Sequence, residues 1–304
     1  MTVQLRKSSP NLRRTIRHKL DKHRNIQKFS TSIYQKYCSA TGWLHVLPDY
    51  LLIGFAKCGT TSLHEYLIQH PSIYPPLGKE IDYFDRLYSR GINWYKAKFP
   101  LKTQKFFIKN ILKKNFITGE ATPRYMEHPH ALTRIKNIIP NVKFIILVRN
   151  PIERAFSHYN MNLRNGYEYR SFEDALKYEE KRIQGRYEKM EKNENFYSWD
   201  YDLFAYLQHG LYIIKLKKWL EVFPREQFLI LQSEEFLESP HTVYYQTLEF
   251  LNLPKWEPSG YQLFKKREYV DKKIDPKVRQ ELRDYFEPFN EELYKLVGKN
   301  YHWN

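Results

Sequence analysis

The sequence Gly54-Phe55-Ala56-Lys57-Cys58-Gly59-Thr60-Thr61-Ser62-Leu63 follows an apolar run, residues 50–54, that is typical of a buried strand. Gly59 permits a tight turn, and a helix that begins after it presents unpaired backbone N–H groups to an anion. Lys57 adds a full positive charge, and hydroxyls follow at Thr60, Thr61 and Ser62. The stretch predicts a strand, a phosphate-binding loop and a helix; an ordinary Gly-containing turn is the alternative.

The spacing of this loop differs from that of the nucleoside triphosphatase P-loop. That loop has Lys directly after its last Gly, then Ser or Thr for magnesium, whereas Lys57 precedes Gly59 by two residues and Thr60 takes the Lys position. A later apolar run, residues 142–148, ends in Arg149, where a magnesium-binding Asp would be expected. The pattern disfavours a P-loop kinase or other nucleotide phosphotransferase, which we keep as the alternative function.

A second anion site is predicted where the 142–148 run ends. Arg149 stands before an Asn-Pro turn and a helix expected over residues 152–162, and open α/β sheets bind ligands outside the carboxyl ends of their strands. Ser157 lies two turns into that helix, and an Arg fork with a hydroxyl suits a terminal phosphate dianion. An ion pair between Arg149 and Glu153 is the alternative, but beside the first loop the anion site is favoured.

Short apolar runs alternate with helical patterns from Asp49 onward, which predicts a parallel sheet with crossover helices. Strands are expected at residues 50–54, 116–119, 142–148 and 228–231, and helices at 60–69, 128–137, 152–162, 210–222, 240–251 and 276–298. Residues 164–200, rich in charge and Tyr, are expected to form helices and a mobile insert near the site. The predicted fold class is α/β: a single domain with a central, mostly parallel sheet flanked by helices.

The chain of 304 residues carries a formal net charge of +16, and much of it is local. Residues 1–48 hold ten Lys or Arg and one acid, Asp21. We therefore separate a basic N-terminal extension, residues 1–45 with a helix across 12–27, from a domain at 46–304. A basic balance favours anionic ligands such as nucleotides, acidic glycans, nucleic acid or membrane surfaces. For the extension, a solvated tail and a salt-sensitive anion binder are both open.

The remaining composition points to a reducing compartment. Two cysteines, Cys38 and Cys58, fit neither a disulfide framework nor a zinc spacing. No apolar run approaches the ~18 residues of a membrane helix, and no apolar stretch follows the basic N-terminus as in a secretory signal. We expect a soluble, cytoplasmic protein.

Taken together, the two anion sites resemble those of the sulfotransferases that use 3′-phosphoadenosine 5′-phosphosulfate (PAPS), in particular the heparan sulfate branch and its bacterial relatives. In that family a Lys-x-Gly-Thr-Thr/Ser-Ser/Ala loop binds the 5′-phosphosulfate. The resemblance gives this role to Lys57, Gly59, Thr60, Thr61 and Ser62, with Lys57 at the bridging oxygen of the leaving group. A similar strand, Arg-(Asp/Asn)-Pro turn and Ser-bearing helix binds the 3′-phosphate, which implies that role for Arg149 and Ser157.

The resemblance also supplies a base. Candidates near the first loop are His64, Glu65, His70 and Glu80. Heparan sulfate enzymes resemble residues 79–85, with Lys-Glu-x-x-Phe/Tyr-Phe-Asp at a similar distance from the loop, and the Glu of that motif is their base. This implies that Glu80 is the base, and Lys79 beside it would favour the ionised carboxylate.

Other stretches extend the resemblance over roughly residues 48–304, namely 89–95, 119–125 and 297–303. Asp82 and Asp85 become candidates for orienting the acceptor. Heparan sulfate enzymes tend to carry Lys at the position of Ala121; either Arg124 compensates or the acceptor is not heparan-like. Lys266 and Arg267 occupy the region where relatives close a basic lid over the nucleotide, and a plain surface patch is the alternative.

The function implied is in-line transfer of a sulfuryl group from PAPS to a hydroxyl or amine of a glycan or small-molecule acceptor, with adenosine 3′,5′-bisphosphate as product. No metal is expected, because Lys57 and the loop amides supply the positive charge. The relatives' C-terminal disulfide and Golgi membrane anchor have no counterpart, which fits a bacterial, cytoplasmic enzyme. A nucleic-acid partner is not expected.

Overall fold

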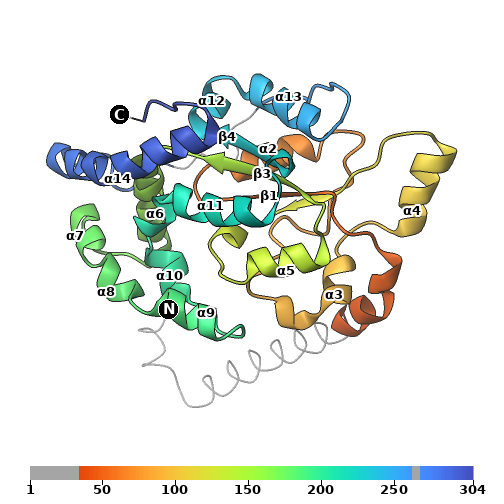
Figure 1. The fold of residues 1–304 in the computed structure, drawn as a ribbon, viewed down its shortest axis with the longest axis horizontal. Helices are drawn as coiled ribbons and strands as arrows, with labels where there is room; N and C mark the ends of the chain where they lie inside the picture. Colours follow the sequence, from red (N-terminus) through yellow and green to blue (C-terminus); the bar gives the residue numbers. More distant parts are fainter. Residues whose placement is uncertain (1–33, 262–267, 304) are drawn as a thin grey trace, which may run out of the picture.

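The computed structural model describes residues 34–261 and 268–303, so the helix expected across 12–27 lies outside the described residues. At its centre is a four-stranded parallel sheet in the order β2-β1-β3-β4 (Figure 1). The strands are β1 (Tyr50–Gly54), β2 (Gly119–Ala121), β3 (Lys143–Val148) and β4 (Phe228–Gln232). The predicted α/β class, with a parallel sheet flanked by helices, is confirmed.

The order of the strands decides where a ligand can bind. β1 lies between β2 and β3, so the chain leaves β1 on one side to form β2 and returns on the other side to form β3. Such a reversal opens a crevice outside the carboxyl ends of the two strands at the switch, here β1 and β3. The two predicted anion sites follow these strands, so the topology brings them to the same edge of the sheet.

The second strand, β2, begins at Gly119 and not at Phe116 as expected. The prediction of 116–119 rested on the apolar character of Phe116. The Phe116 ring instead stacks on Tyr74, with centroids 4.3 Å apart, and Ile117 bridges to Ile73 rather than to β1. Pairing with β1 starts at Gly119, where a Cβ would lie 2.5 Å from the Tyr50 carbonyl oxygen. The close approach of the two backbones therefore needs glycine at this point.

Helices cover both faces of the sheet, and those predicted are found with ends shifted by at most three residues. In Figure 1, α2 and α13 lie on one side of the sheet and α5 and α11 on the other. The confirmed helices are α2 (Thr60–Leu67), α5 (Ala131–Ile138), α6 (Pro151–Asn165), α11 (Tyr212–Val222), α13 (Pro240–Phe250) and α14 (Pro276–Val297). Both faces being covered explains why every residue of β1 is buried.

Several shorter elements complete the domain. Within the expected 164–200 insert and just after it lie α7 (Phe172–Lys177), α8 (Glu179–Ile183), α9 (Arg186–Lys192) and α10 (Trp199–Phe204), so its helical character is confirmed. Elements not expected are a helix at 34–41, α3 (Ile92–Lys96), α4 (Lys102–Phe106), the π-helical η4 (Phe107–Ile111) and α12 (Ser233–Glu238). Single 3-10 turns are η2 (Gly42–Leu44), η3 (Tyr88–Arg90), η5 (Pro123–Met126), η6 (Gln208–Gly210) and η7 (Arg225–Gln227).

Candidate active site

The loop between β1 and α2 adopts a backbone shape that ordinary turns avoid. Lys57 has φ 76° and Gly59 has φ 94°, both in the left-handed region. A non-glycine residue pays about 1–2 kcal/mol to stay there, so the conformation at Lys57 is held by its surroundings. Gly59 caps α2, whose first-turn amides point out of the helix end. This strained turn at a helix N-terminus is the geometry expected of an anion cradle.

Two hydrogen bonds from residues that follow β3 and β4 hold the loop in place. Ser233 Oγ donates to the Cys58 carbonyl at 2.5 Å, and Arg149 Nη1 donates to the Lys57 carbonyl at 3.2 Å. Thr60 and Ser62 are buried at the start of α2, while Thr61 is half-buried. Cys58 is buried, and burial raises the pKa of its thiol to about 12, so it stays protonated and does not act as a nucleophile.

Arg149 joins the two predicted anion sites. It follows β3, and its guanidinium reaches across to the loop after β1, while its own carbonyl accepts a hydrogen bond from Tyr212 Oη at 2.8 Å. The alternative pairing with Glu153 is not observed, because Glu153 pairs with Arg279 at 2.8 Å. The Asn150 side chain accepts from the Ile152 and Glu153 amides and thereby begins α6.

Ser157 lies on α6, two turns from this start, and is buried. The structure therefore brings Lys57, Gly59 and Arg149 together at the switch edge of the sheet, with Ser157 on the helix that leaves it. Lys266 and Arg267 lie outside the described residues.

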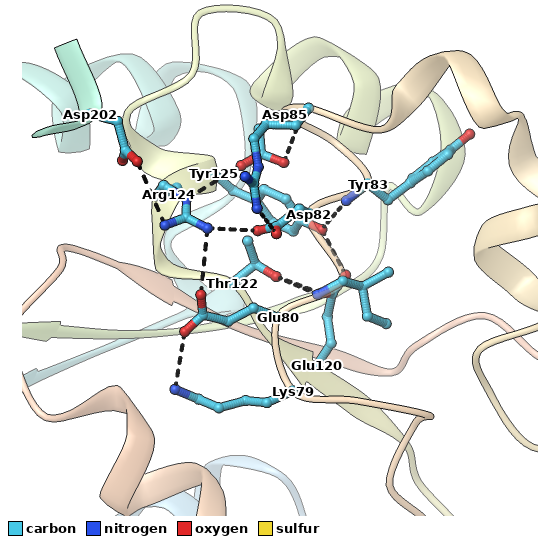
Figure 2. A network of polar contacts seen from close by, with 12 residues as sticks. Lys79, Glu80, Asp82, Tyr83, Asp85, Glu120, Thr122, Arg124, Tyr125 and Asp202 are labelled. Atoms are coloured by element: carbon cyan, nitrogen blue, oxygen red, sulfur yellow. Dashed lines mark hydrogen bonds and ion pairs between the residues drawn. The ribbon is translucent and has the colours of Figure 1, made fainter. Parts of the chain in front are cut away.

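Glu80 reaches the same edge from the loop that follows α2. Lys79 Nζ donates to Thr61 Oγ1 at 2.6 Å. The same Nζ lies 3.4 Å from Glu80 Oε1 (Figure 2). One lysine thus connects the predicted base to the first turn of α2. The Glu80 side chain is 37% exposed, so an acceptor molecule can approach it.

The other candidate bases have different surroundings. His64 is buried, and burial, with a smaller contribution from Lys79, lowers its pKa to about 4. His70 is buried too, and its ring contacts the Pro254 carbonyl at 3.1 Å while accepting from the Ser72 amide. Both histidines are thus buried, whereas the Glu80 side chain is 37% exposed and Glu65 is partly buried.

Arg124 forms the centre of a carboxylate cluster beside Glu80. Its Nη2 lies 3.0 Å from Asp82 Oδ1 and 3.5 Å from Glu80 Oε2, its Nε lies 3.9 Å from Asp85 Oδ2, and its Nη1 lies 3.8 Å from Asp202 Oδ2 (Figure 2). The two predicted acceptor-side aspartates are therefore in one network with Arg124.

Asp85 is the most buried carboxylate of this cluster. Burial, helped by the neighbouring Asp82 charge, raises the pKa of Asp85 to about 7 despite a 2.6 Å hydrogen bond from the Arg86 amide. A cavity of about 90 Å³ opens beside it, lined also by Arg86, Arg134 and Tyr197. The charge next to this cavity therefore changes near neutral pH.

A second buried carboxylate, Glu120 on β2, supports the segment that carries the predicted base, Glu80. Its Oε1 accepts from Tyr95 Oη at 2.6 Å and Tyr125 Oη at 3.0 Å, and its Oε2 accepts from Thr122 Oγ1 at 2.7 Å and the Ile81 amide at 3.4 Å. Burial raises its pKa to about 7 against the effect of these donors. Glu120 therefore fixes the backbone immediately after Glu80.

The same support continues two residues further along the chain, at Tyr83. Tyr125 Oη also accepts from the Tyr83 amide at 3.0 Å (Figure 2). The Tyr83 ring stacks on Tyr95 with centroids 4.5 Å apart. Sequence reasoning did not select Glu120 or Asp202 as site residues. An acid in an otherwise apolar short strand was the available signal for Glu120, whereas nothing in the sequence around Asp202 marked it.

The comparisons with known proteins identify the family. A family model described as "Sulfotransferase domain" matches residues 47–287. The chain belongs to the sulfotransferase domain family. A sulfotransferase of known structure from Alicyclobacillus acidocaldarius is 30% identical, with a TM-score of 0.64, over 85% of this chain and 99% of that one. The resemblance inferred from the loops is confirmed, and the kinase alternative is not favoured.

Curated relatives include eukaryotic sulfotransferases. Heparan sulfate glucosamine 3-O-sulfotransferase 3B1 of Mus musculus is 31% identical over 85% of this chain and 65% of that protein. Membrane-associated sulfotransferase kil1 of Dictyostelium discoideum is 29% identical over 86% of this chain and 68% of that protein. The chain thus spans about two thirds of the length of these relatives.

Residues 34–261 and 268–303, which the structure describes, contain neither a membrane-spanning helix nor a cluster of metal ligands. No helix there has the length and apolarity needed to cross a membrane. In the same residues, no group of three or more His, Cys, Asp or Glu side chains is arranged to hold a metal ion.

Proposed function

We propose that this sulfotransferase moves the sulfuryl group of PAPS to a hydroxyl or amine of a glycan or small-molecule acceptor, with Glu80 as the base. The observation that carries the proposal is the link from Glu80 through Lys79 to Thr61, at 3.4 and 2.6 Å. It places a solvent-accessible carboxylate beside the first turn of a helix whose N-terminus suits an anion.

The donor would bind across the crevice at the switch between β1 and β3. Lys57, Gly59 and the hydroxyls of Thr60, Thr61 and Ser62 would hold the 5′-phosphosulfate, since they surround the end of α2. Arg149 and Ser157 would hold the 3′-phosphate. The hydrogen bond from Arg149 to the Lys57 carbonyl supports this division, because it keeps the two anion sites at a fixed separation.

In the proposed reaction the acceptor oxygen or nitrogen attacks sulfur in line with the bond to the 5′-phosphate. A new bond to sulfur forms, the bridging S–O bond breaks, and its electron pair leaves with adenosine 3′,5′-bisphosphate. Glu80 takes the acceptor proton, while Lys57 and the loop amides stabilise the negative charge that grows on the leaving phosphate.

The acceptor side is proposed to include Asp82, Asp85 and Arg124. Arg124 is tied to four carboxylates, those of Glu80, Asp82, Asp85 and Asp202, so its charge is largely balanced. Ala121, at the position where heparan sulfate enzymes tend to carry Lys, is buried on β2. These acceptor-side residues therefore lack the unbalanced cation that a polyanion would need. A neutral sugar or a small molecule fits it better than a heparan-like chain.

The test of the base is Glu80→Gln, which keeps the shape of the side chain and removes its ability to take a proton. We expect PAPS turnover with a panel of sugars, phenols and amines to fall by about 10²–10⁴-fold, while binding of adenosine 3′,5′-bisphosphate is kept. Glu292→Gln is the matched control, since Glu292 is an exposed ion-pair partner of Lys217. Full activity in Glu80→Gln would remove the base assignment.

For the whole chain, we propose a cytoplasmic location and the division into a basic extension, 1–45, and a catalytic domain, 46–304. The buried free thiols of Cys38 and Cys58 support the first point. Cell fractionation and limited proteolysis near residue 45 test these two assignments.

A further inference from the structure

One segment of the domain combines positive charge with exposed apolar side chains. Residues 86–119 contain no Asp or Glu. They contain nine Lys or Arg: Arg86, Arg90, Lys96, Lys98, Lys102, Lys105, Lys109, Lys113 and Lys114. A run of this length without an acid produces a local positive field beyond the general basicity of the chain.

The helical part of this segment lies at the outer edge of the molecule, away from the sheet (Figure 1). It consists of α4 and η4, residues 102–111. Within residues 101–115, all of which the structure describes, only Ile108 is fully buried. Large apolar side chains are instead open to solvent, with exposed fractions of 63% for Phe106 and 61% for Ile111.

We define the α4 patch as the exposed apolar side chains and the exposed lysines of residues 101–114. Its apolar members are Leu101, Phe106, Phe107, Ile111 and Leu112, and its lysines are Lys102, Lys109, Lys113 and Lys114, all exposed. Exposed apolar side chains that occur singly need no explanation, but five within residues 101–112 mark an interaction surface.

The patch is held on the domain in a fixed orientation. Lys105 Nζ pairs with Asp49 Oδ1 at 3.0 Å and lies 5.6 Å from the centre of the Phe116 ring. Phe116 in turn stacks on Tyr74, and Ile108 is buried against the domain. The helix is thus formed and anchored without a partner, so a partner would meet a preformed surface.

We propose that the α4 patch docks the protein onto a membrane surface that carries anionic lipids. Phe and Leu side chains insert at the boundary between headgroups and acyl chains, and the surrounding lysines attract the anionic headgroups. A helix with both kinds of side chain, in a segment without Asp or Glu from residue 86 to 119, matches this surface in charge and in polarity.

Other occupants match less well. A second copy of the chain, docked patch to patch by two-fold symmetry, would bring the same cations together and repel. A nucleic acid would engage the lysines but would leave Ile111 and Leu112 without an apolar partner. Both remain as outcomes that the experiment can report.

The experiment is co-sedimentation of the full chain with vesicles of phosphatidylcholine alone or with one third phosphatidylserine. We expect binding only to the anionic vesicles. Phe107→Ser with Ile111→Ser should weaken it about tenfold or more, and Lys109→Gln with Lys113→Gln should weaken it roughly fivefold for each lysine. All four side chains are exposed, so the variants should keep the wild-type melting temperature and bisphosphate binding.

Matched controls lie elsewhere on the surface. Leu237→Ser removes another exposed apolar side chain, and Lys192→Gln with Lys295→Gln removes two exposed lysines outside the patch. Both controls should bind vesicles like the wild type. Equal binding by the patch variants and the wild type would overturn the proposal and assign any binding to the basic extension. Binding to neutral vesicles, or a patch-dependent dimer or RNA complex without vesicle binding, would overturn it as well.

Discussion

Glu120 provides the sharpest test of the architecture around the base. It is fully buried on β2, and its carboxyl accepts four hydrogen bonds, one of them from the backbone amide next to Glu80. In Glu120→Gln the side chain keeps its shape but one oxygen becomes an amide donor. Each carboxyl oxygen of Glu120 accepts two hydrogen bonds, and an amide NH2 group in the place of either oxygen accepts none. The segment that carries Glu80 therefore loses part of its support.

The size of the effect follows from the pKa of Glu120, which burial raises from its usual 4.5 to about 7. The folded protein holds this proton more tightly than the unfolded chain. The contribution of Glu120 to stability is therefore fully present below pH 4.5 and is lost as the pH rises through 7. At 1.36 kcal/mol per unit, the loss between pH 5 and pH 8 is about 2–3 kcal/mol.

The assay is urea unfolding of the wild type and Glu120→Gln at pH 5, 6, 7 and 8. Other carboxyls with raised pKa, such as Asp85 and Glu127, contribute equally to both proteins and cancel in the difference. The free energy of unfolding of the wild type, minus that of the variant, should fall by about 2–3 kcal/mol over this range. Parallel pH profiles would refute the buried, ionisable state assigned to Glu120.

Activity provides the second readout for the same variant. Because Glu120 touches the backbone beside Glu80 and not the donor loop, Glu120→Gln should lower kcat and leave the Kd for adenosine 3′,5′-bisphosphate unchanged. Glu292→Gln, at an exposed ion pair, should change neither quantity. A loss of bisphosphate binding in Glu120→Gln would mean that the residue supports the whole fold rather than the base.

Three further substitutions test the backbone and the anion site. Gly119→Ala should lower the free energy of urea unfolding by about 3 kcal/mol or more, because its Cβ would lie 2.5 Å from the Tyr50 carbonyl oxygen. A variant as stable as the wild type would show that β1 and β2 are further apart. In Gly59→Ala the new Cβ has room, because the nearest atom is 3.6 Å away, but an alanine at φ 94° costs about 1–2 kcal/mol. Calorimetry should therefore show weaker bisphosphate binding, in a protein that is more stable than Gly119→Ala. Unchanged affinity would argue against the strained loop. Arg279→Gln breaks a half-exposed ion pair with Glu153. It should lower the free energy of unfolding by less than about 1 kcal/mol in the same assay and leave bisphosphate binding unchanged. A large loss of binding would show that Arg279 is needed to keep Glu153 from pairing with Arg149.

The strand-end loops were predictable because their signals are local. The apolar run before Gly54, the Gly59 turn and Arg149 after a second apolar run each have a direct physical meaning, and the parallel topology then brings them together. The strand β2 was misplaced because Phe116 is apolar for packing on Tyr74 and not for pairing with β1. Periodicity does not separate these two reasons for an apolar residue.

The acceptor side was less predictable because its contacts join distant segments. Asp202 meets Arg124 only through the placement of α10, and Glu120 reaches the Ile81 amide across 39 residues. Short polar side chains in such networks carry no periodic signal. The α4 patch was missed for a related reason: apolar residues among lysines look like a weak core helix until their exposure is known.

The central claim, that the paired strand-end sites bind a PAPS-type donor, is tested most directly by calorimetric titration with adenosine 3′,5′-bisphosphate in the absence of metal. We predict binding with a Kd on the order of micromolar, weakened roughly 10–100-fold in Arg149→Ala through the loss of a charge-assisted hydrogen bond. ATP with magnesium serves as the comparison ligand. Clear binding of magnesium ATP together with no binding of the bisphosphate would contradict the account.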